Sequence, residues 1–246
     1  MKIALFSDIH ANLPAFEAFL KDLDSRQPDA VYCLGDLVGY HIYPNEVIAE
    51  IRRRGIATIA GNHDLKVSNL TPVTPEKLAT TGKNYAYHIV EQGHREYLSS
   101  LPAHIRLEYR LGGEQLNMVL VHGTPRSNDE YLLADLDEQY VNTLMDEAGA
   151  DILCAGHSHK PFHRVIARQN GKPGHVINIG STGKPKDNNP MGCYVMITLT
   201  DKSELSDIES IKVEFIRFEY DVEASAKAIE NSPLPDEFAD RLRGGY

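Results

Sequence analysis

Side chains that can bind metal ions or transfer protons stand at five places in this sequence, and a short apolar run precedes each. Carboxylate, imidazole and amide groups are hard or borderline ligands, which suit Mn²⁺, Fe, Zn²⁺, Ni²⁺ or Co²⁺. No cysteine lies in these blocks, which excludes a thiolate zinc site. The ligands are too many for one ion and suit two divalent metal ions that share a carboxylate. The blocks are Asp8-x-His10, Gly35-Asp36, Gly61-Asn62-His63-Asp64, His122-Gly123 and Gly156-His157-Ser158-His159.

Each block taken alone also has an ordinary structural explanation. Asp8 could cap a helix or a turn, and Gly35-Asp36 and Gly61-Asn62 could be plain turns. His122 alone could be a buried, hydrogen-bonded histidine. Two imidazoles at one strand end, at His157 and His159, repel each other once protonated and are easier to explain as neutral ligands. The metal-site hypothesis therefore depends on the five blocks meeting in space.

The first third of the chain predicts strands that alternate with helices. Apolar runs at residues 1–6, 29–34 and 56–60 indicate buried strands, and residues 13–25 and 46–54 have helical periodicity. Asn12 is a good N-cap, and Pro14 fits the first helical turn. Successive strand–loop–helix units favour parallel strands, and open α/β sheets place their sites at the carboxyl ends of such strands.

The rest of the chain is richer in antiparallel strands. Residues 65–103 carry no apolar strand and indicate a helical insertion, with helices over 75–92 and 94–101. Hairpins are expected at 105–121, across Gly112-Gly113, and at 163–179, across Asn170-Gly171. Further strands are expected at 151–155, 193–199 and 211–218, helices at 136–148 and 221–230, and a polar, mobile loop at 201–210. The fold class is α/β: one domain, 1–246, with two mixed sheets packed together and helices outside.

Composition narrows the choice of partners and location. The net charge of −10 argues against an extended nucleic-acid or membrane surface, although bound cations can attract a small anion locally. Three scattered cysteines, no signal peptide and no long apolar run predict reduced thiols in a cytoplasmic protein. The oligomeric state is left open.

In their order and at their strand ends, the five blocks resemble the calcineurin-like metallophosphoesterase superfamily. The similarity is greatest to its small prokaryotic phosphodiesterase and phosphatase branch, and it extends to Val38-Gly39-Tyr40 and Gly180-Ser181-Thr182-Gly183. The resemblance implies a four-layer α/β/β/α sandwich. It also implies one metal held by Asp8, His10, Asp36 and His159, and a second held by Asp36, Asn62, His122 and His157.

The resemblance also implies the roles of other residues. His63 would contact the phosphate and protonate the leaving oxygen, and Asp64 would support the site, which makes them the candidate catalytic residues. Candidate substrate-binding residues are Asn12, Tyr40, His41 and Ser181. Protein Ser/Thr phosphatases carry a further Asp and then Arg-Gly after Gly-Asp, where this chain has Gly39-Tyr40. The acid that supports the catalytic histidine and an arginine that clamps phosphate are therefore missing.

These inferences predict a metal-dependent phosphoesterase in which a hydroxide bridging two metals attacks a phosphodiester or a related small phosphate ester. Nucleotides are among the candidate substrates, and diesters are preferred to monoesters. The alternatives are a non-catalytic scaffold with this fold and a nuclease for long DNA, which the acidic charge disfavours. Lys184 and Lys186 could steer phosphate, but the preferred interpretation is that they are flexible surface lysines. Histidines outside the blocks are interpreted as surface or core residues: His88, His94, His104, His163 and His175.

Overall fold

Two mixed sheets form the centre of the computed structural model, which describes residues 1–71, 73–168 and 171–246. In the first sheet, β1, β2 and β3 are parallel, and β9 and β10 are antiparallel to their neighbours. In the second, β5, β6 and β8 are parallel, and β4 and β7 are antiparallel edge strands. The first sheet has the order β10 (Lys212–Phe218), β9 (Gly192–Thr198), β1 (Lys2–Phe6), β2 (Ala30–Cys33), β3 (Ala57–Thr58). The second has the order β4 (His104–Leu111), β5 (Glu114–Val121), β6 (Ile152–Ala155), β8 (Pro173–Asn178), β7 (Phe162–Ala167).

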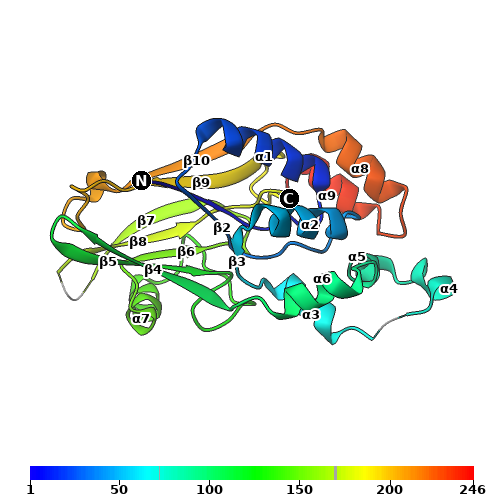
Figure 1. Ribbon diagram of the computed structural model, residues 1–246, viewed down its shortest axis with the longest axis horizontal. Coiled ribbons are helices and arrows are strands. Elements are labelled where there is room, and N and C mark those ends of the chain that lie inside the picture. Colours follow the sequence, from blue (N-terminus) through cyan, green and yellow to red (C-terminus); the bar gives the residue numbers. More distant parts are fainter. Residues whose placement is uncertain (72, 169–170) are drawn as a thin grey trace.

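Helices cover the outer faces of both sheets, which confirms the predicted four-layer α/β/β/α sandwich (Figure 1). Successive side chains of β1 point to opposite faces of the first sheet, so this strand contributes to two layers of the core. Phe6 packs against Phe19 of α1 (Leu13–Arg26), while Ile3 and Leu5 lie in the core between the sheets. Helix α2 (Pro44–Arg54) lies beside α1, and α7 (Glu138–Ala148) covers the second sheet on its other face. Asn12 caps α1 as predicted, accepting a hydrogen bond from Ala15 N–H at 3.3 Å.

The segment between β3 and β4 is helical as predicted but more broken. It contains α3 (Asn62–Asn69), α4 (Pro75–Leu78), the 3₁₀ turn η1 (Gly82–Asn84), α5 (Tyr85–His88) and α6 (Gln92–Ser99). The prediction of one helix over 75–92 is wrong. The hydroxyls of Thr80 and Thr81 donate back to carbonyls of the preceding turn, and Gly82 then takes a left-handed φ of 52°. Both features end a helix. Strand β3 is also shorter than predicted, because only Ala57 and Thr58 pair with β2.

The C-terminal residues, which the sequence left as a tail, form a helix that packs near the strand ends. Asp221 caps α8 (Val222–Glu230), and α9 (Glu237–Gly244) lies against α8. Phe238 of α9 contacts the ring of Tyr40, with centroids 5.1 Å apart. The C-terminus therefore lies close to the loop that follows β2.

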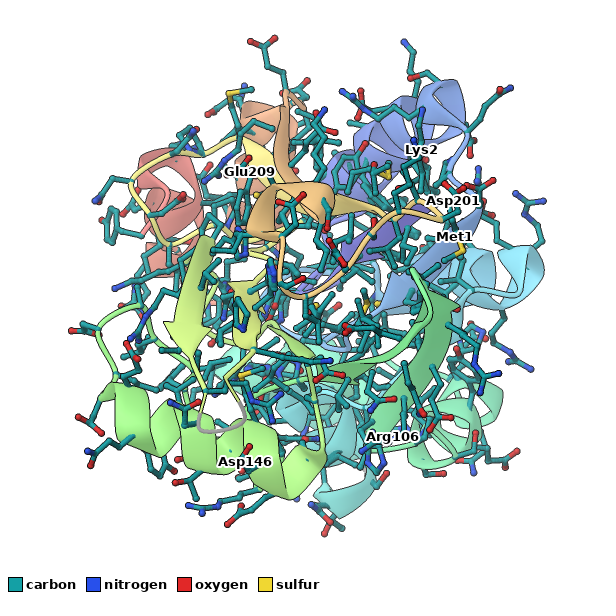
Figure 2. All side chains as sticks on the ribbon, turned by 90° about the vertical axis from the view of Figure 1, so that its left-hand side faces the viewer. Met1, Lys2, Arg106, Asp146, Asp201 and Glu209 are labelled. Atoms are coloured by element: carbon teal, nitrogen blue, oxygen red, sulfur yellow. The ribbon has the colours of Figure 1, made fainter. Side chains whose placement is uncertain are left out.

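The opposite end of the molecule carries the N-terminus and the connection between β9 and β10. Figure 2 views this end, where Asp201 lies beside Met1. The connection includes η2 (Ile208–Ser210), and Ser203 donates a hydrogen bond to the carbonyl of Ser210 at 2.7 Å. The 163–179 hairpin is confirmed by the pairing of β7 with β8, but Asn170 of its turn lies outside the described residues. In the described chain, no helix has both the length and the apolar character needed to cross a membrane.

Candidate metal centre

The predicted ligands follow the carboxyl ends of strands from both sheets. Asp8 and His10 follow β1, Asp36 follows β2, and the second sheet supplies His122 after β5 and His157 and His159 after β6. Contacts between the loops join the two sheets. The backbone N–H of His157 donates to Asp8 Oδ2 at 3.0 Å, and His122 Nδ1–H donates to the carbonyl of Leu34 at 2.7 Å.

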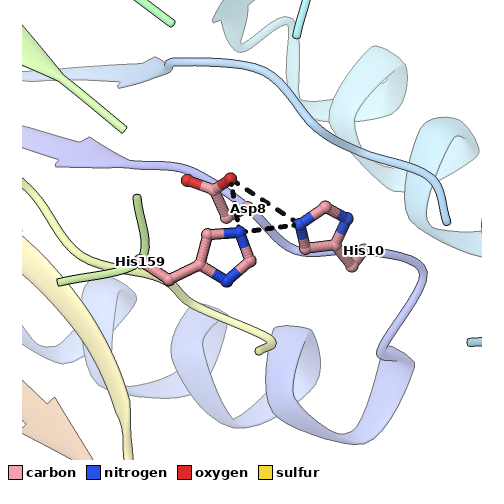
Figure 3. A group of neighbouring side chains, drawn as sticks. All are labelled: Asp8, His10 and His159. Atoms are coloured by element: carbon pink, nitrogen blue, oxygen red, sulfur yellow. Dashed lines mark hydrogen bonds and ion pairs between the residues drawn. The ribbon is translucent and has the colours of Figure 1, made fainter. Parts of the chain in front are cut away.

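One group of candidate ligands consists of Asp8, His10 and His159 (Figure 3). Asp8 Oδ1 lies 3.1 Å from His159 Nε2 and 3.6 Å from His10 Nε2. The two Nε2 atoms lie 3.1 Å apart. All three residues are buried, so their converging polar atoms are shielded from bulk water.

A second group consists of Asp36, His122 and His157, with Asn62 beside it. Asp36 Oδ2 lies 3.4 Å from His122 Nε2, and Asn62 Oδ1 lies 3.2 Å from the same nitrogen. Asp36 Oδ2 also lies 3.6 Å from His10 Nε2 of the first group. One carboxylate oxygen therefore lies between the two groups, which is the position of a shared ligand.

Backbone carbonyls orient three of the imidazole rings. In each of these rings Nδ1–H donates to a backbone carbonyl. His10 donates to Val38 at 2.9 Å, His122 donates to Leu34, and His159 donates to Lys184. A proton on Nδ1 leaves the lone pair on Nε2, which is the atom that points into each group. Such outer hydrogen bonds fix ring orientation and tautomer in metal sites.

The polar atoms without partners show that these residues fit metal ions. Asp8 Oδ1, Asp36 Oδ2 and His157 Nε2 are buried and make no hydrogen bond. The other oxygens of both carboxylates are used, since Asp36 Oδ1 accepts the backbone N–H of His63 at 2.8 Å and Asp8 Oδ2 accepts that of His157. Burying unpaired polar atoms is costly, and cations would satisfy them.

Backbone strain is concentrated at the same residues. Asp8, His10, Asp36, His157 and His159 all have φ between 52° and 63°, in the left-handed region. Each such conformation costs about 1 kcal/mol or more for a residue with a Cβ. Gly61 makes room for Asp36, because a Cβ there would lie 2.1 Å from Asp36 Oδ1. The fold holds the candidate ligands in place against local preference.

Electrostatics favour positive charge at this centre. Burial by itself raises the pKa of Asp36. The nearby His122, His63 and His10 lower it by more than burial raises it, so the pKa is well below its usual value. Burial lowers the pKa of His122, but Asp36 and Asp8 raise it to about 10, so without a cation Nε2 holds a second proton, which a metal ion would have to displace. Burial raises the pKa of Asp8, but His159 and His10 bring it well below its usual value, so Asp8 and Asp36 both stay ionised and stabilise a cation beside them.

The two predicted catalytic residues have different surroundings. Asp64 is buried, and its carboxylate accepts the backbone N–H groups of Asp36, Leu37 and Gly61 at 2.7–2.9 Å. It positions the loops that carry Asp36 and Asn62. His63 could itself join His10 and Asp36 around an ion, with its ring 4.8 Å from that of His10, and burial lowers its pKa to about 3.

Among the predicted substrate-binding residues, Tyr40 lines the centre, with its ring 4.8 Å from that of His10 and 4.9 Å from that of His63. The other three are buried and bonded within the protein. Asn12 donates to the carbonyl of Gly183 and accepts from Ser225, and Ser181 donates to the carbonyl of Asp8. His41 Nδ1 bonds the carbonyl of His10. These contacts stabilise the loops around the ligands.

Sequence reasoning missed two tyrosines near the centre and placed one lysine wrongly. Tyr87 bonds the ring of His63, and Tyr131, which is 47% exposed, stacks on the ring of His157 at 4.3 Å. The interpretation of Lys184 as a surface lysine is wrong, because it is only 3% exposed, with Nζ 4.6 Å from the Tyr40 ring centroid. Burial, with Lys186 and Arg241, lowers the pKa of Lys184 to about 7. The position of Lys184 shortly after Gly180-Ser181-Thr182-Gly183 was the available signal.

The histidines outside the blocks do not join this centre. His163 and His175 lie together on β7 and β8, where their rings stack 5.2 Å apart. His88 and His94 lie in the helical segment, and His104 begins β4.

Comparison with known proteins agrees with this geometry. A model of the calcineurin-like phosphoesterase superfamily domain matches residues 1–202. A protein of Methanocaldococcus jannaschii, itself named as uncharacterised, is 29% identical over 253 residues, which cover 98% of this chain and 96% of that protein.

Two solved structures resemble the whole chain. A metallophosphoesterase from Sphaerobacter thermophilus superposes with a TM-score of 0.76 at 25% identity, covering 100% of this chain and 99% of that one. A hypothetical protein from Pyrococcus horikoshii OT3 superposes with a TM-score of 0.75 at 25% identity, covering 100% and 98%.

Proposed function

Since this chain belongs to the calcineurin-like phosphoesterase superfamily, we propose that it hydrolyses phosphodiesters or related small phosphate esters, including nucleotides, with two divalent metal ions. One ion is held by Asp8, His10, Asp36 and His159. The other is held by Asp36, Asn62, His122 and His157. The observation that carries this proposal is the position of Asp36 Oδ2. This oxygen is buried, makes no hydrogen bond, and lies 3.6 Å from His10 Nε2 of the first ligand group and 3.4 Å from His122 Nε2 of the second.

Two bound ions would lower the pKa of a water molecule, which then attacks phosphorus, and would offset the charge of the phosphate. Asp8 and Asp36 remain ionised to hold positive charge, and carbonyl-bonded Nδ1–H groups keep Nε2 of three imidazoles available. Asp64 keeps the loop of Asp36 and Asn62 in place.

His63 donates a hydrogen bond to the charge that develops on the leaving oxygen, because its ring borders the ligands and its Nδ1 already bonds the Tyr87 hydroxyl. Lys184 attracts the anionic substrate, since its buried ammonium group faces Tyr40 and no ion pair with a described residue neutralises it. Tyr40 and Tyr131 provide ring surface for an organic group of the ester, such as a nucleobase.

The test is hydrolysis of bis-p-nitrophenyl phosphate, followed by a panel of natural diesters and monoesters, with protein loaded with Mn²⁺, Fe²⁺, Zn²⁺, Ni²⁺ or Co²⁺. We expect metal-dependent turnover, lost on chelation and restored by added metal. His63→Ala should reduce the rate by about 10²–10³-fold, as loss of one hydrogen-bond donor to a developing negative charge does. Folded, metal-loaded protein that hydrolyses no ester would favour the scaffold alternative.

A further inference from the structure

Tyr87 lies against His63 and bonds one of its ring nitrogens. Its hydroxyl is 2.6 Å from His63 Nδ1, and the two ring centroids are 5.8 Å apart. Tyr87 is buried and comes from α5, in the helical segment between β3 and β4. No carboxylate in the described chain has a hydrogen bond or ion pair with the His63 ring, and the phenol of Tyr87 bonds its Nδ1 instead.

We propose that Tyr87 is a positioning residue that fixes His63 in the tautomer with its proton on Nε2. This inference rests on the proposed function, because it concerns how His63 meets the leaving oxygen. A neutral imidazole carries one N–H. When the Tyr87 hydroxyl donates to Nδ1, the ring proton must sit on Nε2. The neutral ring then donates a hydrogen bond from Nε2 to the leaving oxygen and keeps its proton, whereas the opposite tautomer would present a lone pair to that oxygen and repel it.

The surroundings favour the hydroxyl of Tyr87 as donor. The ammonium group of Lys66 lies 4.4 Å from the centroid of the Tyr87 ring. A cation over the ring stabilises negative charge on the phenol, which makes O–H a better donor than acceptor. Burial, with nearby Tyr40 and Asp36, raises the pKa of Tyr87, so the hydroxyl keeps its proton.

The fold holds Tyr87 firmly. The guanidinium group of Arg95, on α6, donates to the carbonyls of Tyr87 at 2.6 Å, His88 at 3.1 Å and Val90 at 2.8 Å, and to that of Val67 in α3 at 3.1 Å. It thus ties α5 to the helix that begins at Asn62 and His63. Arg95 is the reason that a four-residue helix can place a hydroxyl accurately.

Gly39 leaves the space that the pair needs. A Cβ on Gly39 would lie 2.6 Å from His63 Nδ1 and 3.2 Å from the Tyr87 hydroxyl oxygen. The φ of Gly39 is also 95°, a conformation that residues with a Cβ rarely adopt. The glycine that replaces an acid in this stretch therefore admits the tyrosine.

The first measurement is of the tautomer and needs no substrate. In Zn²⁺-loaded protein with ¹⁵N-labelled histidine, long-range ¹H–¹⁵N spectra distinguish the two ring nitrogens, and the His63→Ala variant identifies the His63 signals. We expect an unprotonated Nδ1 and a protonated Nε2 in the wild type, and a mixture of tautomers in Tyr87→Phe. A proton on Nδ1 of the wild-type ring would overturn the proposal.

The second measurement separates positioning from general stability. Tyr87→Phe should lower kcat by about 10-fold for esters with poor alkoxide leaving groups, within the 10–100-fold range for lost orienting partners. Tyr87→Phe should change kcat little for esters whose leaving group is p-nitrophenolate, because this stable anion needs no hydrogen-bond donor. The KM should stay unchanged for both kinds of ester. Tyr85→Phe, on the same helix, is the matched control and should behave as the wild type.

The outcomes separate the two proposals. If Tyr87→Phe lowers the rate equally for all leaving groups, or resembles Tyr85→Phe, Tyr87 does not act through His63. If the wild type hydrolyses no ester, the proposed function fails, while the tautomer measurement still decides the role of Tyr87. Circular dichroism and thermal melting of both variants show whether the fold is kept.

Discussion

The replacement of Asp36 by asparagine tests the shared ligand position directly. Asp36 Oδ1 accepts the backbone N–H of His63 at 2.8 Å, so the amide oxygen of the variant should take that position and the NH₂ group should replace Oδ2. The NH₂ group cannot bind a cation, but it can donate to Nε2 of His10 and His122, which lie 3.6 and 3.4 Å from the present oxygen. The variant should therefore still fold without metal, although it loses the attraction by which Asp36 raises the pKa of His122.

The expected loss of metal binding follows from the lost charge. Two unit charges 4 Å apart interact by about 4 kcal/mol at an effective dielectric constant of 20, which corresponds to about a thousandfold in affinity. A divalent ion and a directly bound oxygen make the true loss larger, so this is a lower bound. Because Asp36 lies between both groups, we expect both ions to bind more weakly.

The assay is metal content after equilibrium dialysis of chelator-treated protein against Zn²⁺ or Mn²⁺, measured by mass spectrometry, with thermal melting with and without metal. The wild type should hold two ions per chain and melt at a higher temperature with metal. Asp36→Asn should hold at most one ion and lose that increase. Asp24→Asn, which alters an exposed acid paired with Arg54, is the control. A variant that keeps two ions at wild-type affinity would refute the shared-ligand interpretation.

Two further predictions concern buried bases. Lys184→Met should raise KM for phosphate esters about 10-fold or more, since a hydrogen bond to a charged group contributes about 1.5–3 kcal/mol; the control Lys202→Met, at an exposed site, should not. Burial and His163 lower the pKa of His175 from 6.5 to about 4, so the unfolded chain binds more protons between these values, and the free energy of unfolding falls by up to about 3 kcal/mol as the pH is lowered from 6.5 to 4. In urea unfolding at pH 7 and pH 4.5, His175→Phe should lose this part of the pH dependence, and an unchanged dependence would contradict the assignment.

Much of the centre could be predicted because its ligands belong to local patterns. Asp8, Asp36 and His122 each lie within three residues of the end of an apolar strand, and parallel strands bring such positions to one edge of their sheet. The structure brings these ligands into two adjoining groups, although their binding of two ions remains a prediction. The resemblance to a known family supplied the division of roles, which spacing alone could not.

One physical reason explains why the sequence did not reveal the positions of Tyr87 and Lys184. Tyr87 and Lys184 meet the centre through α5 and through a loop after β8, and no periodicity in those segments refers to His63 or Tyr40. The C-terminal helix was similarly left without a role, because its packing through Phe238 against Tyr40 depends on how α8 and α9 turn back over the strand ends.

The sequence by itself determined the strand ends, their glycines and the kinds of ligand found there, because these depend on neighbouring residues and on side-chain chemistry. Only the tertiary structure decided that Asp36 Oδ2 lies between two groups, that Lys184 is buried, and that Tyr87 bonds His63. Those facts depend on how two sheets and a helical segment meet, and contacts between residues far apart in the chain leave no local trace in sequence.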